Sequence, residues 1–222
     1  MPDAPRSEKQ LLERAGRLAG RTLQMTATDI GLALPGNPGH AKGWIGTIAE
    51  TFLGATARNL AEPDFQLIGV ELKTLPLGKN GLPRESTYVC TVPLVDTDDL
   101  TWETSTVKRK LDRVLWLPVE GDPDIPYAER RFGSAFLWSP DVHQESQLRE
   151  DWEELMDMII LGQLDRIGSS LGNILQIRPK AANAASLGRS WDEDGNPAAT
   201  LPRGFYLRSS FTAGILSSHL GS

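Results

Sequence analysis

Segments with helical periodicity alternate with segments of strand periodicity along the 222-residue chain, and this alternation restricts the fold more than any other feature. Helical patterns predict helices over residues 7–20, 41–54, 104–111, 144–161 and 212–220. Alternating or short apolar runs predict strands over residues 64–75, 86–95, 114–117, 174–178 and 205–207. Because the sequence contains no repeats, low-complexity tracts or obvious linkers, we expect one mixed α/β domain over residues 1–222.

Capping and turn residues predict where several of these elements begin and end. Ser7, with Gln10 three residues later, is a suitable N-cap for the first helix, and Gly20 marks its expected end. The Gly- and Pro-rich residues 31–40 predict a loop. A turn over residues 78–83 separates the first two strands, so we expect them to form a β-hairpin, and Pro118 marks the expected end of the third strand.

Net charge argues mildly against a protein that binds nucleic acid by bulk electrostatics alone. The formal net charge is −6, and charged residues make up 23% of the chain. The charge is segregated, however: basic residues gather over 108–113 and again between 178 and 208, whereas acidic residues concentrate over 145–165. An enzyme that collects carboxylates around a metal ion can be acidic overall while its binding groove is basic.

Cysteine content and hydropathy indicate where such a chain resides. Cys90 is the only cysteine and lies in an apolar run, so we expect a small core residue in a reducing compartment. The first residues lack the apolar core of a secretion signal, and no apolar run approaches the ~20 residues that cross a bilayer. We therefore expect a cytoplasmic protein without membrane attachment.

Four charged residues form the pattern that most clearly indicates a catalytic site. Asp64 is followed after six residues by Glu71-Leu72-Lys73, and alternation along a strand places Glu71 and Lys73 on one face, roughly 6.6 Å apart. Glu50, off the apolar stripe of the preceding helix, supplies a further carboxylate. Carboxylate oxygens suit Mg²⁺, and a nearby lysine can position the water that attacks a phosphodiester. Exposed strands also carry Glu and Lys two residues apart, so a solvated strand face is the alternative.

Several blocks of sequence resemble the MutH family of methyl-directed mismatch-repair endonucleases. The blocks occupy residues 42–46, 69–74, 101–105, 113–116, 151–159 and 201–207. They follow one another in a single order from the first helices to nearly the C-terminus, without large gaps.

The resemblance implies a restriction-endonuclease-like α/β fold, in which a mixed β-sheet is flanked by helices and two lobes form a DNA-binding cleft. It implies a Mg²⁺-dependent enzyme that nicks the unmethylated strand of hemimethylated GATC sites, on the 5′ side of the guanine. The implied partners are double-stranded DNA containing GATC, the ATP-dependent activator MutL and, indirectly, MutS. No Gly-rich phosphate loop is present, so any ATP dependence must come from a partner. We expect a monomer.

The resemblance also implies roles for individual residues of the active site. Asp64 and Glu71 correspond to metal ligands, Glu50 to the helix carboxylate of the same site, and Lys73 to the catalytic lysine. Lys110 matches a further lysine that approaches the scissile phosphate. Without the resemblance, a solvated helix face is the simpler interpretation of Lys110.

DNA contacts are implied for four residues, mostly in the later part of the chain. Arg178 and Tyr206 fall where the family has its base-contacting arginine and tyrosine, and Tyr88 lies where other members carry phenylalanine. Lys180 is expected to contact phosphate, which positions the protein without reading sequence. The alternatives are that Tyr206 is an ordinary strand residue and that Arg178 is an ordinary surface residue.

Two competing functions remain open at this point. One is a restriction endonuclease that cuts both strands of unmethylated GATC. The other is a DNA-binding module that has lost catalysis, although all four active-site groups are present. The tryptophans at 44, 102, 116 and 152 are interpreted as core residues, and the three histidines lack metal-ligand spacing.

Overall fold

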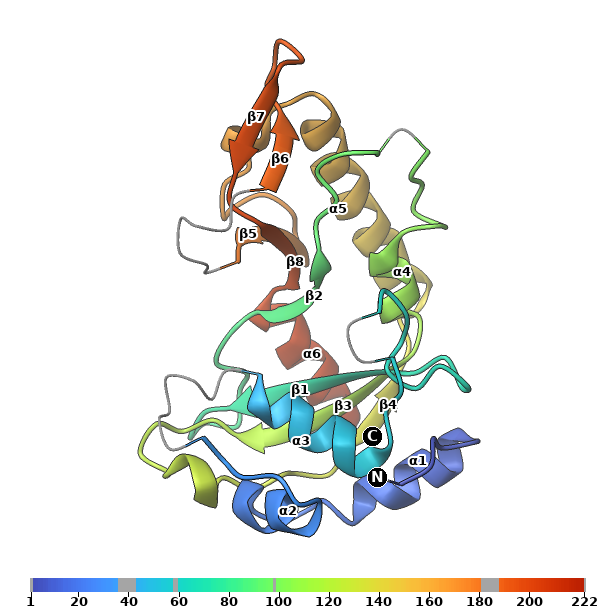
Figure 1. Cartoon of the computed structure of the whole chain (residues 1–222), viewed down its shortest axis with the longest axis vertical. Helices are drawn as coiled ribbons and strands as arrows, with labels where there is room; N and C mark the ends of the chain where they lie inside the picture. The colour runs from blue at the N-terminus through green and yellow to red at the C-terminus, as the bar shows by residue number, and fades with distance from the viewer. Residues whose placement is uncertain (1, 36–42, 58–59, 98, 181–187, 222) are drawn as a thin grey trace. The chain divides into compact units, whose positions relative to one another are not determined.

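The computed structural model describes residues 2–35, 43–57, 60–97, 99–180 and 188–221, and these form two compact units (Figure 1). Unit 1 is built from the chain up to Glu85 together with Asp112–Ser139. Unit 2 is built from Ser86–Leu111 and Pro140–Gly221. Part of the loop expected over 31–40 and the expected helix start at 41 lie outside the described residues.

Unit 1 is a mixed sheet covered by helices on one face. Its elements are α1 (Glu8–Gly16), α2 (Leu23–Asp29), α3 (Trp44–Leu53), β1 (Glu71–Leu77), β3 (Val114–Glu120), the 3-10 turn η2 (Tyr127–Glu129) and β4 (Phe136–Trp138). The strand order is β1-β3-β4, with β1 parallel and β4 antiparallel to β3. Figure 1 shows α1, α2 and α3 together against this sheet, and the buried core between them includes Leu11, Leu23, Ile48, Leu72 and Leu115.

The first helix begins where the sequence predicts and ends earlier. Ser7 accepts a hydrogen bond from the Gln10 N–H at its N-cap, but α1 stops at Gly16 rather than Gly20. Gly20 has φ +79°, the left-handed conformation that glycine tolerates, and it lies in the turn leading to α2. The helix α2 was not predicted. Its seven residues are too few to show a clear helical period.

The expected β-hairpin between the first two strands is wrong. The strand β1 pairs with β3 in parallel, whereas β2 (Thr87–Thr91) pairs with β8 (Arg203–Leu207) in unit 2. A turn does form, with Leu77 bridging Pro83, but the chain leaves unit 1 after Glu85. The turn residues were identified correctly, and local turn chemistry did not specify the partner strand.

The third strand runs through the proline that was expected to end it. Pro118 lies inside β3, beyond the last residue that pairs with β4. Proline has no backbone N–H, but no hydrogen bond between strands is lost at this position. The Pro118 carbonyl still accepts a hydrogen bond from the Gly133 N–H (2.8 Å).

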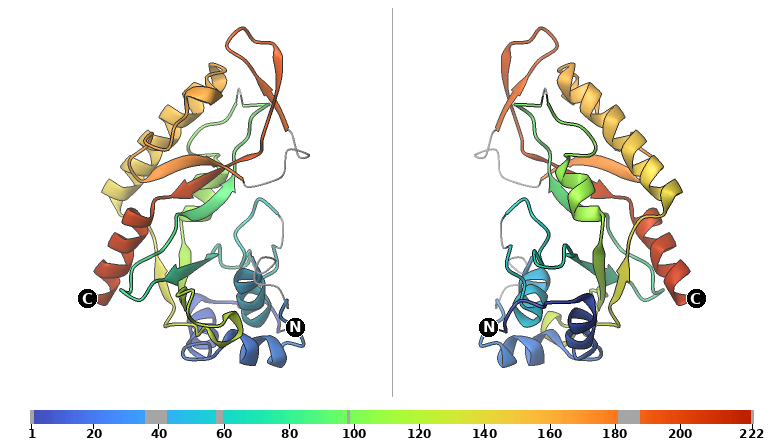
Figure 2. Two further views of the ribbon diagram at one scale, coloured as in Figure 1. Left: turned by 90° about the vertical axis from the view of Figure 1, so that its left-hand side faces the viewer. Right: turned by 90° about the vertical axis from the view of Figure 1, so that its right-hand side faces the viewer.

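Unit 2 contains an antiparallel sheet with the long helix α5 alongside it (Figure 2). Its elements are β2, α4 (Thr106–Leu111), α5 (Val142–Ile160), the 3-10 turn η3 (Leu164–Arg166), β5 (Leu175–Pro179), β6 (Gly188–Trp191), β7 (Pro197–Thr200), β8 and α6 (Ser209–Leu220). The strand order is β2-β8-β5, and β6 and β7 form a separate two-stranded sheet. Trp102 and Trp152 are buried here and Trp116 is buried in unit 1, as predicted, and Cys90 is buried.

A buried carboxylate on α5 fixes the start of β5. Asp151, only 1% exposed, accepts backbone N–H bonds from Asn173 (2.7 Å), Ile174 (2.7 Å) and Leu175 (2.8 Å). The helix itself begins at a capping box formed by Asp141 and Gln144, two residues earlier than predicted. Among the described residues, no helix combines the length and apolar character needed to cross a membrane.

We expect Asp151→Ala to destabilise the protein by about 3 kcal/mol, because three buried N–H donors would lose a charged acceptor. Urea unfolding followed by circular dichroism measures this loss. Asp157→Ala is the matched control, because Asp157 is exposed on the same helix and its removal should change the free energy of unfolding little. Equal stability of the two variants would contradict the assigned role of Asp151.

Candidate active site

A closed turn before β1 brings Asp64 back over the first residues of the strand. The strand was expected to begin at Asp64, but residues 64–70 form this turn and β1 begins at Glu71. The Phe65 N–H donates to the Val70 carbonyl (2.9 Å), and Gly69 has φ +65°. Phe65 and Val70 are buried in the core, so the turn is anchored at both ends. The six residues between Asp64 and Glu71 therefore reverse the chain, which the strand prediction did not anticipate.

The turn places the Asp64 carboxylate beside the backbone of β1. Its Oδ2 accepts from the Leu72 N–H at 2.9 Å. Glu71 and Lys73 flank Leu72, and Lys73 Nζ lies 2.7 Å from Glu71 Oε1. All three charged side chains are buried, with 7%, 2% and 9% of Asp64, Glu71 and Lys73 exposed. The structure thus brings together the three residues on which the predicted site depends.

The electrostatic balance of this group favours an added positive charge. Burial, and next the negative charge of Glu71, raise the pKa of Asp64 to about 7. The Leu72 N–H and the Lys73 ammonium lower this pKa, but they do not compensate. Because two buried carboxylates share one ammonium, a bound cation would relieve the remaining repulsion.

Glu50 approaches the same group from α3. Its negative charge is one of the causes that raise the pKa of Asp64. The preceding turn of α3 carries Gly46, where a Cβ atom would stand 3.5 Å from Glu50 Oε1. Glu50 is half-buried, so a ligand can approach it over the small residue at position 46.

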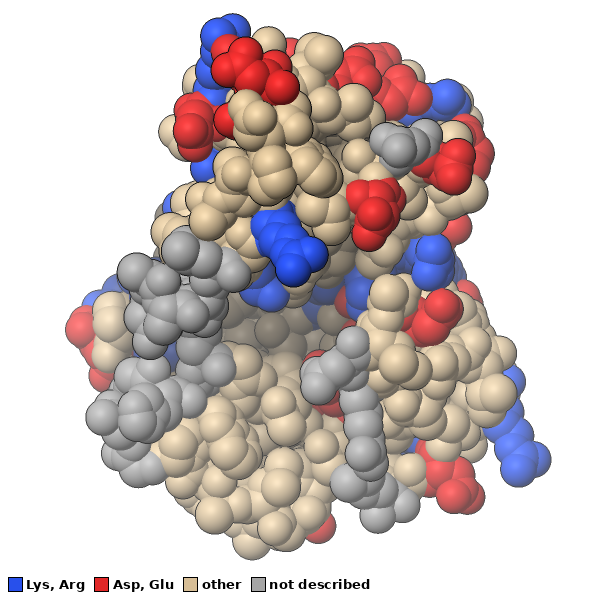
Figure 3. Space-filling view, turned by 45° about the horizontal axis from the view of Figure 1, so that its top comes forward, with Lys and Arg blue, Asp and Glu red and all other residues tan. Residues whose placement is uncertain are grey.

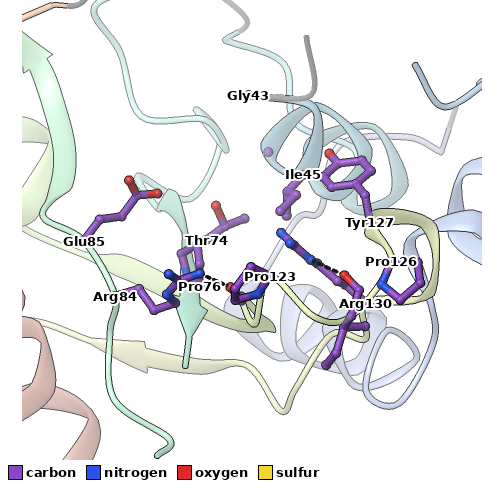
Figure 4. Close-up of a pocket in the computed structure, with 13 residues that line it drawn as sticks. Gly43, Ile45, Thr74, Pro76, Arg84, Glu85, Pro123, Pro126, Tyr127 and Arg130 are labelled. Atoms are coloured by element: carbon purple, nitrogen blue, oxygen red, sulfur yellow. Dashed lines mark hydrogen bonds between the residues drawn. The ribbon is translucent and has the colours of Figure 1, made fainter. Parts of the chain in front are cut away.

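A hollow of about 600 Å³ in unit 1 begins beside Gly46 and Thr74. Figure 4 shows Thr74, Pro76, Arg84 and Glu85 on one side of this hollow and Ile45, Pro126, Tyr127 and Arg130 on the other. Thr74 directly follows Lys73 on β1, and Gly46 lies four residues before Glu50. Glu50, Asp64, Glu71 and Lys73 are not among its lining residues, so the hollow is bordered by sequence neighbours of these groups and not by the groups themselves.

The donor set fits a hard divalent cation that keeps much of its water. Among the described residues, no group of three or more His, Cys, Asp or Glu side chains lies close enough to hold a metal ion by itself. Mg²⁺ is commonly held by one or two carboxylates, with water and substrate phosphate completing its octahedron. Asp64 and Glu71 provide two neighbouring carboxylates of this kind, and the charge of Glu50 also acts on Asp64.

The four predicted DNA-contacting residues form a separate cluster in unit 2. Tyr88 on β2 faces Tyr206 on β8 in register, and their rings meet edge to face at 5.4 Å between centroids. Arg178 on β5 lies over the Tyr206 ring at 5.9 Å, and Lys180 lies over the Tyr88 ring at 4.8 Å. Two cations and two aromatic rings on one sheet suit contacts with phosphates and base edges.

Lys110 and two unpredicted residues complete the description of unit 2. Lys110 is half-buried in α4, and its approach to the carboxylates of unit 1 stays a prediction. Thr91 and Gly204 border the aromatic cluster, and sequence reasoning missed both. A glycine beside Phe205-Tyr206 was a usable signal for a close approach of side chains, whereas nothing in the sequence distinguished Thr91.

Comparison with known proteins relates the whole chain to one family. Residues 53–151 match the family model described as "DNA mismatch repair enzyme MutH". The chain is 53% identical over 215 residues to the DNA mismatch repair protein MutH of Escherichia coli O6:K15:H31 (strain 536 / UPEC), covering 97% of this chain and 94% of the relative. It is 49% identical over 219 residues to the DNA mismatch repair protein MutH of Vibrio parahaemolyticus serotype O3:K6, covering 99% of this chain and 97% of the relative.

The raised pKa of Asp64 predicts that this carboxylate destabilises the metal-free protein above neutral pH. The group ionises near pH 4 in the unfolded chain and at about 7 in the folded protein. Its contribution to stability is therefore complete below pH 4 and is lost as the pH rises to about 7. Asp64→Asn removes this loss and keeps an acceptor for the Leu72 N–H.

We expect Asp64→Asn to be more stable than the wild type at pH 8 in EDTA, by up to about 4 kcal/mol. At pH 4 the two proteins should unfold alike. Urea titrations at both pH values measure the difference. If the difference in free energy of unfolding between the two proteins is the same at pH 4 and pH 8, the pKa of Asp64 is not raised in the folded protein.

Proposed function

This chain belongs to the MutH family of DNA mismatch repair enzymes and is a mismatch-repair endonuclease, and we propose that it nicks the unmethylated strand at hemimethylated GATC sites, using Mg²⁺. The cut falls on the 5′ side of the guanine. The observation that supports this most directly is the buried group of Asp64, Glu71 and Lys73 on a turn and strand of unit 1.

Asp64 and Glu71 hold the divalent cation in this proposal, and Glu50 orients a water molecule of its coordination sphere. The cation, when bound, supplies Lewis acidity at the scissile phosphate and offsets charge on the leaving oxygen. Lys73 directs its ammonium at the attacking water or the phosphate from the same strand face as Glu71. Lys110 adds a second cation at the phosphate.

Recognition of the methylation state is assigned to the aromatic cluster of unit 2. Adenine presents N7 and N6 to the major groove, and methylation of N6 adds bulk there and removes one donor hydrogen. The Tyr206 ring packs edge to face against the Tyr88 ring, so it cannot easily move away from the extra methyl group. Arg178 contacts a base, Lys180 contacts a phosphate, and Tyr88 lies near the bases.

The proposed partners are DNA containing GATC, MutL as the ATP-dependent activator and, through MutL, MutS. The exposed face of α5 carries Glu150, Glu154 and Asp157, and we propose it as a candidate surface for a partner. In Figure 3 the acidic side chains form several separate groups on the viewed face, with other residues between them. We propose that the enzyme acts as a monomer in the cytoplasm, where its substrate lies.

The proposed strand choice predicts the products from three otherwise identical duplexes. With Mg²⁺, hemimethylated GATC should be nicked on its unmethylated strand only, and fully methylated GATC should stay intact, because the methyl group clashes at the base edge. End-labelling each strand and resolving the products on denaturing gels measures this. Rapid breakage of both strands of unmethylated GATC, without any partner protein, would instead indicate a restriction endonuclease.

Removing either charged group of β1 should abolish nicking. We expect Glu71→Ala and Lys73→Ala to lower the rate constant on the order of 100-fold or more, because metal binding and water positioning are lost. Lys79→Ala is the matched control, since Lys79 is exposed and pairs with Asp124 at the surface of the same unit. Mg²⁺-dependent nicking that persists undiminished in either β1 variant would refute the site assignment, and a shared loss in the control would indicate a general effect of lysine removal.

A further inference from the structure

The ammonium of Lys180 is held by two hydroxyl groups from a strand that is not its neighbour. Lys180 Nζ donates to Tyr88 Oη (3.1 Å) and to Thr91 Oγ1 (3.2 Å), and these two hydroxyls bond to each other at 2.9 Å. The ammonium also lies over the face of the Tyr88 ring. An ammonium has three N–H donors, so one donor is left for a ligand.

Gly204 provides the space through which this contact is made. In the β2-β8-β5 sheet, Gly204 on the central strand pairs with Thr91 on one side and with Arg178 on the other. A Cβ atom at Gly204 would stand 2.8 Å from Cε2 of Tyr88 and 3.0 Å from Cε2 of Tyr206. Both distances are shorter than van der Waals contact. The missing side chain therefore lets the two rings fill the centre of the sheet and lets Lys180 reach across β8.

The charges of this cluster are not neutralised by neighbouring carboxylates. Among the described residues, Lys180 is bonded to hydroxyls and Arg178 is placed against an aromatic ring, and neither has an acidic partner. Hydroxyls and rings orient a cation without cancelling its charge. Such an arrangement suits a cation that must be ordered and still attract an anionic ligand.

We propose that Thr91 and the Tyr88 hydroxyl are positioning groups that order the Lys180 ammonium before DNA binds, with Gly204 providing the path across the sheet. This rests on the proposed function, because the ligand of Lys180 is a phosphate oxygen of the DNA. A lysine side chain normally loses rotamer freedom when it binds, and a lysine that is already ordered loses less. The hydroxyl of Tyr88, which a phenylalanine would lack, thereby has a defined purpose.

The experiment compares Thr91→Val, which removes the hydroxyl at nearly constant volume, with Thr91→Ser, which retains it. Thr91 is exposed, so neither change should disturb folding. We expect Thr91→Val to weaken binding of a hemimethylated GATC duplex roughly three- to tenfold, with Ca²⁺ replacing Mg²⁺ to prevent cleavage. Thr91→Ser should restore most of the affinity. The nicking rate at saturating DNA should fall by less than the affinity does.

A double-mutant cycle separates positioning from a general structural effect. In a Lys180→Met background, Thr91→Val should have no further effect on affinity, because the group that Thr91 orients is absent. The proposal would be overturned if Thr91→Val lowered DNA affinity equally with and without Lys180, or if Thr91→Val bound DNA with wild-type affinity.

A second measurement needs no DNA and keeps this proposal distinct from the proposed function. In free protein, the Lys180 ammonium should give a ¹⁵N-detected NMR signal with slow proton exchange, and Thr91→Val should accelerate that exchange markedly. If the wild type neither binds nor nicks GATC duplexes, the proposed function fails while this signal still tests the ordering of Lys180. Exchange that is equally fast in the wild type and in Thr91→Val would refute the ordering itself.

Discussion

The repulsion between the buried Asp64 and Glu71 carboxylates is the interaction on which the catalytic part of unit 1 depends. Left to themselves, two such groups would separate or take up a proton. The turn closed by Phe65 and Val70 prevents separation, because both residues are anchored in the core. Burial, and next the negative charge of Glu71, raise the pKa of Asp64 to about 7. Unit 1 thus maintains a local excess of negative charge that only a cation offsets well.

The sequence was most informative where one local rule governed a segment. Alternation on β1 correctly predicted that Glu71 and Lys73 lie close together, and Ser7 correctly predicted the start of α1. The apolar stripes of α3 and α5 predicted buried faces that the structure has. In each case the information lies within a few residues, where spacing alone decides which side chains meet.

Long-range pairing could not be predicted in the same way. The turn after β1 was visible, yet β2 pairs with β8, more than a hundred residues later. The gap between Asp64 and Glu71 was interpreted as strand because Gly69 permits either a bulge or a reversal of the chain. Thr91 was missed for a related reason: its importance depends on the register of β2 against β8 and on the absence of a side chain at Gly204.

The division of the chain into segments has a consequence for its synthesis. Unit 1 needs β3 and β4 from Asp112–Ser139, and these are made only after the first segment of unit 2, Ser86–Leu111, has left the ribosome. The strand β1 therefore waits for its parallel neighbour, and β2 waits for β8 near the far end of the chain. Neither unit is a contiguous piece of the chain, so unit 1 can be completed only after Ser139 has been made, and unit 2 only after β8 and α6 have been made. A single recombination point between β1 and β8 would likewise divide a sheet rather than exchange an intact module.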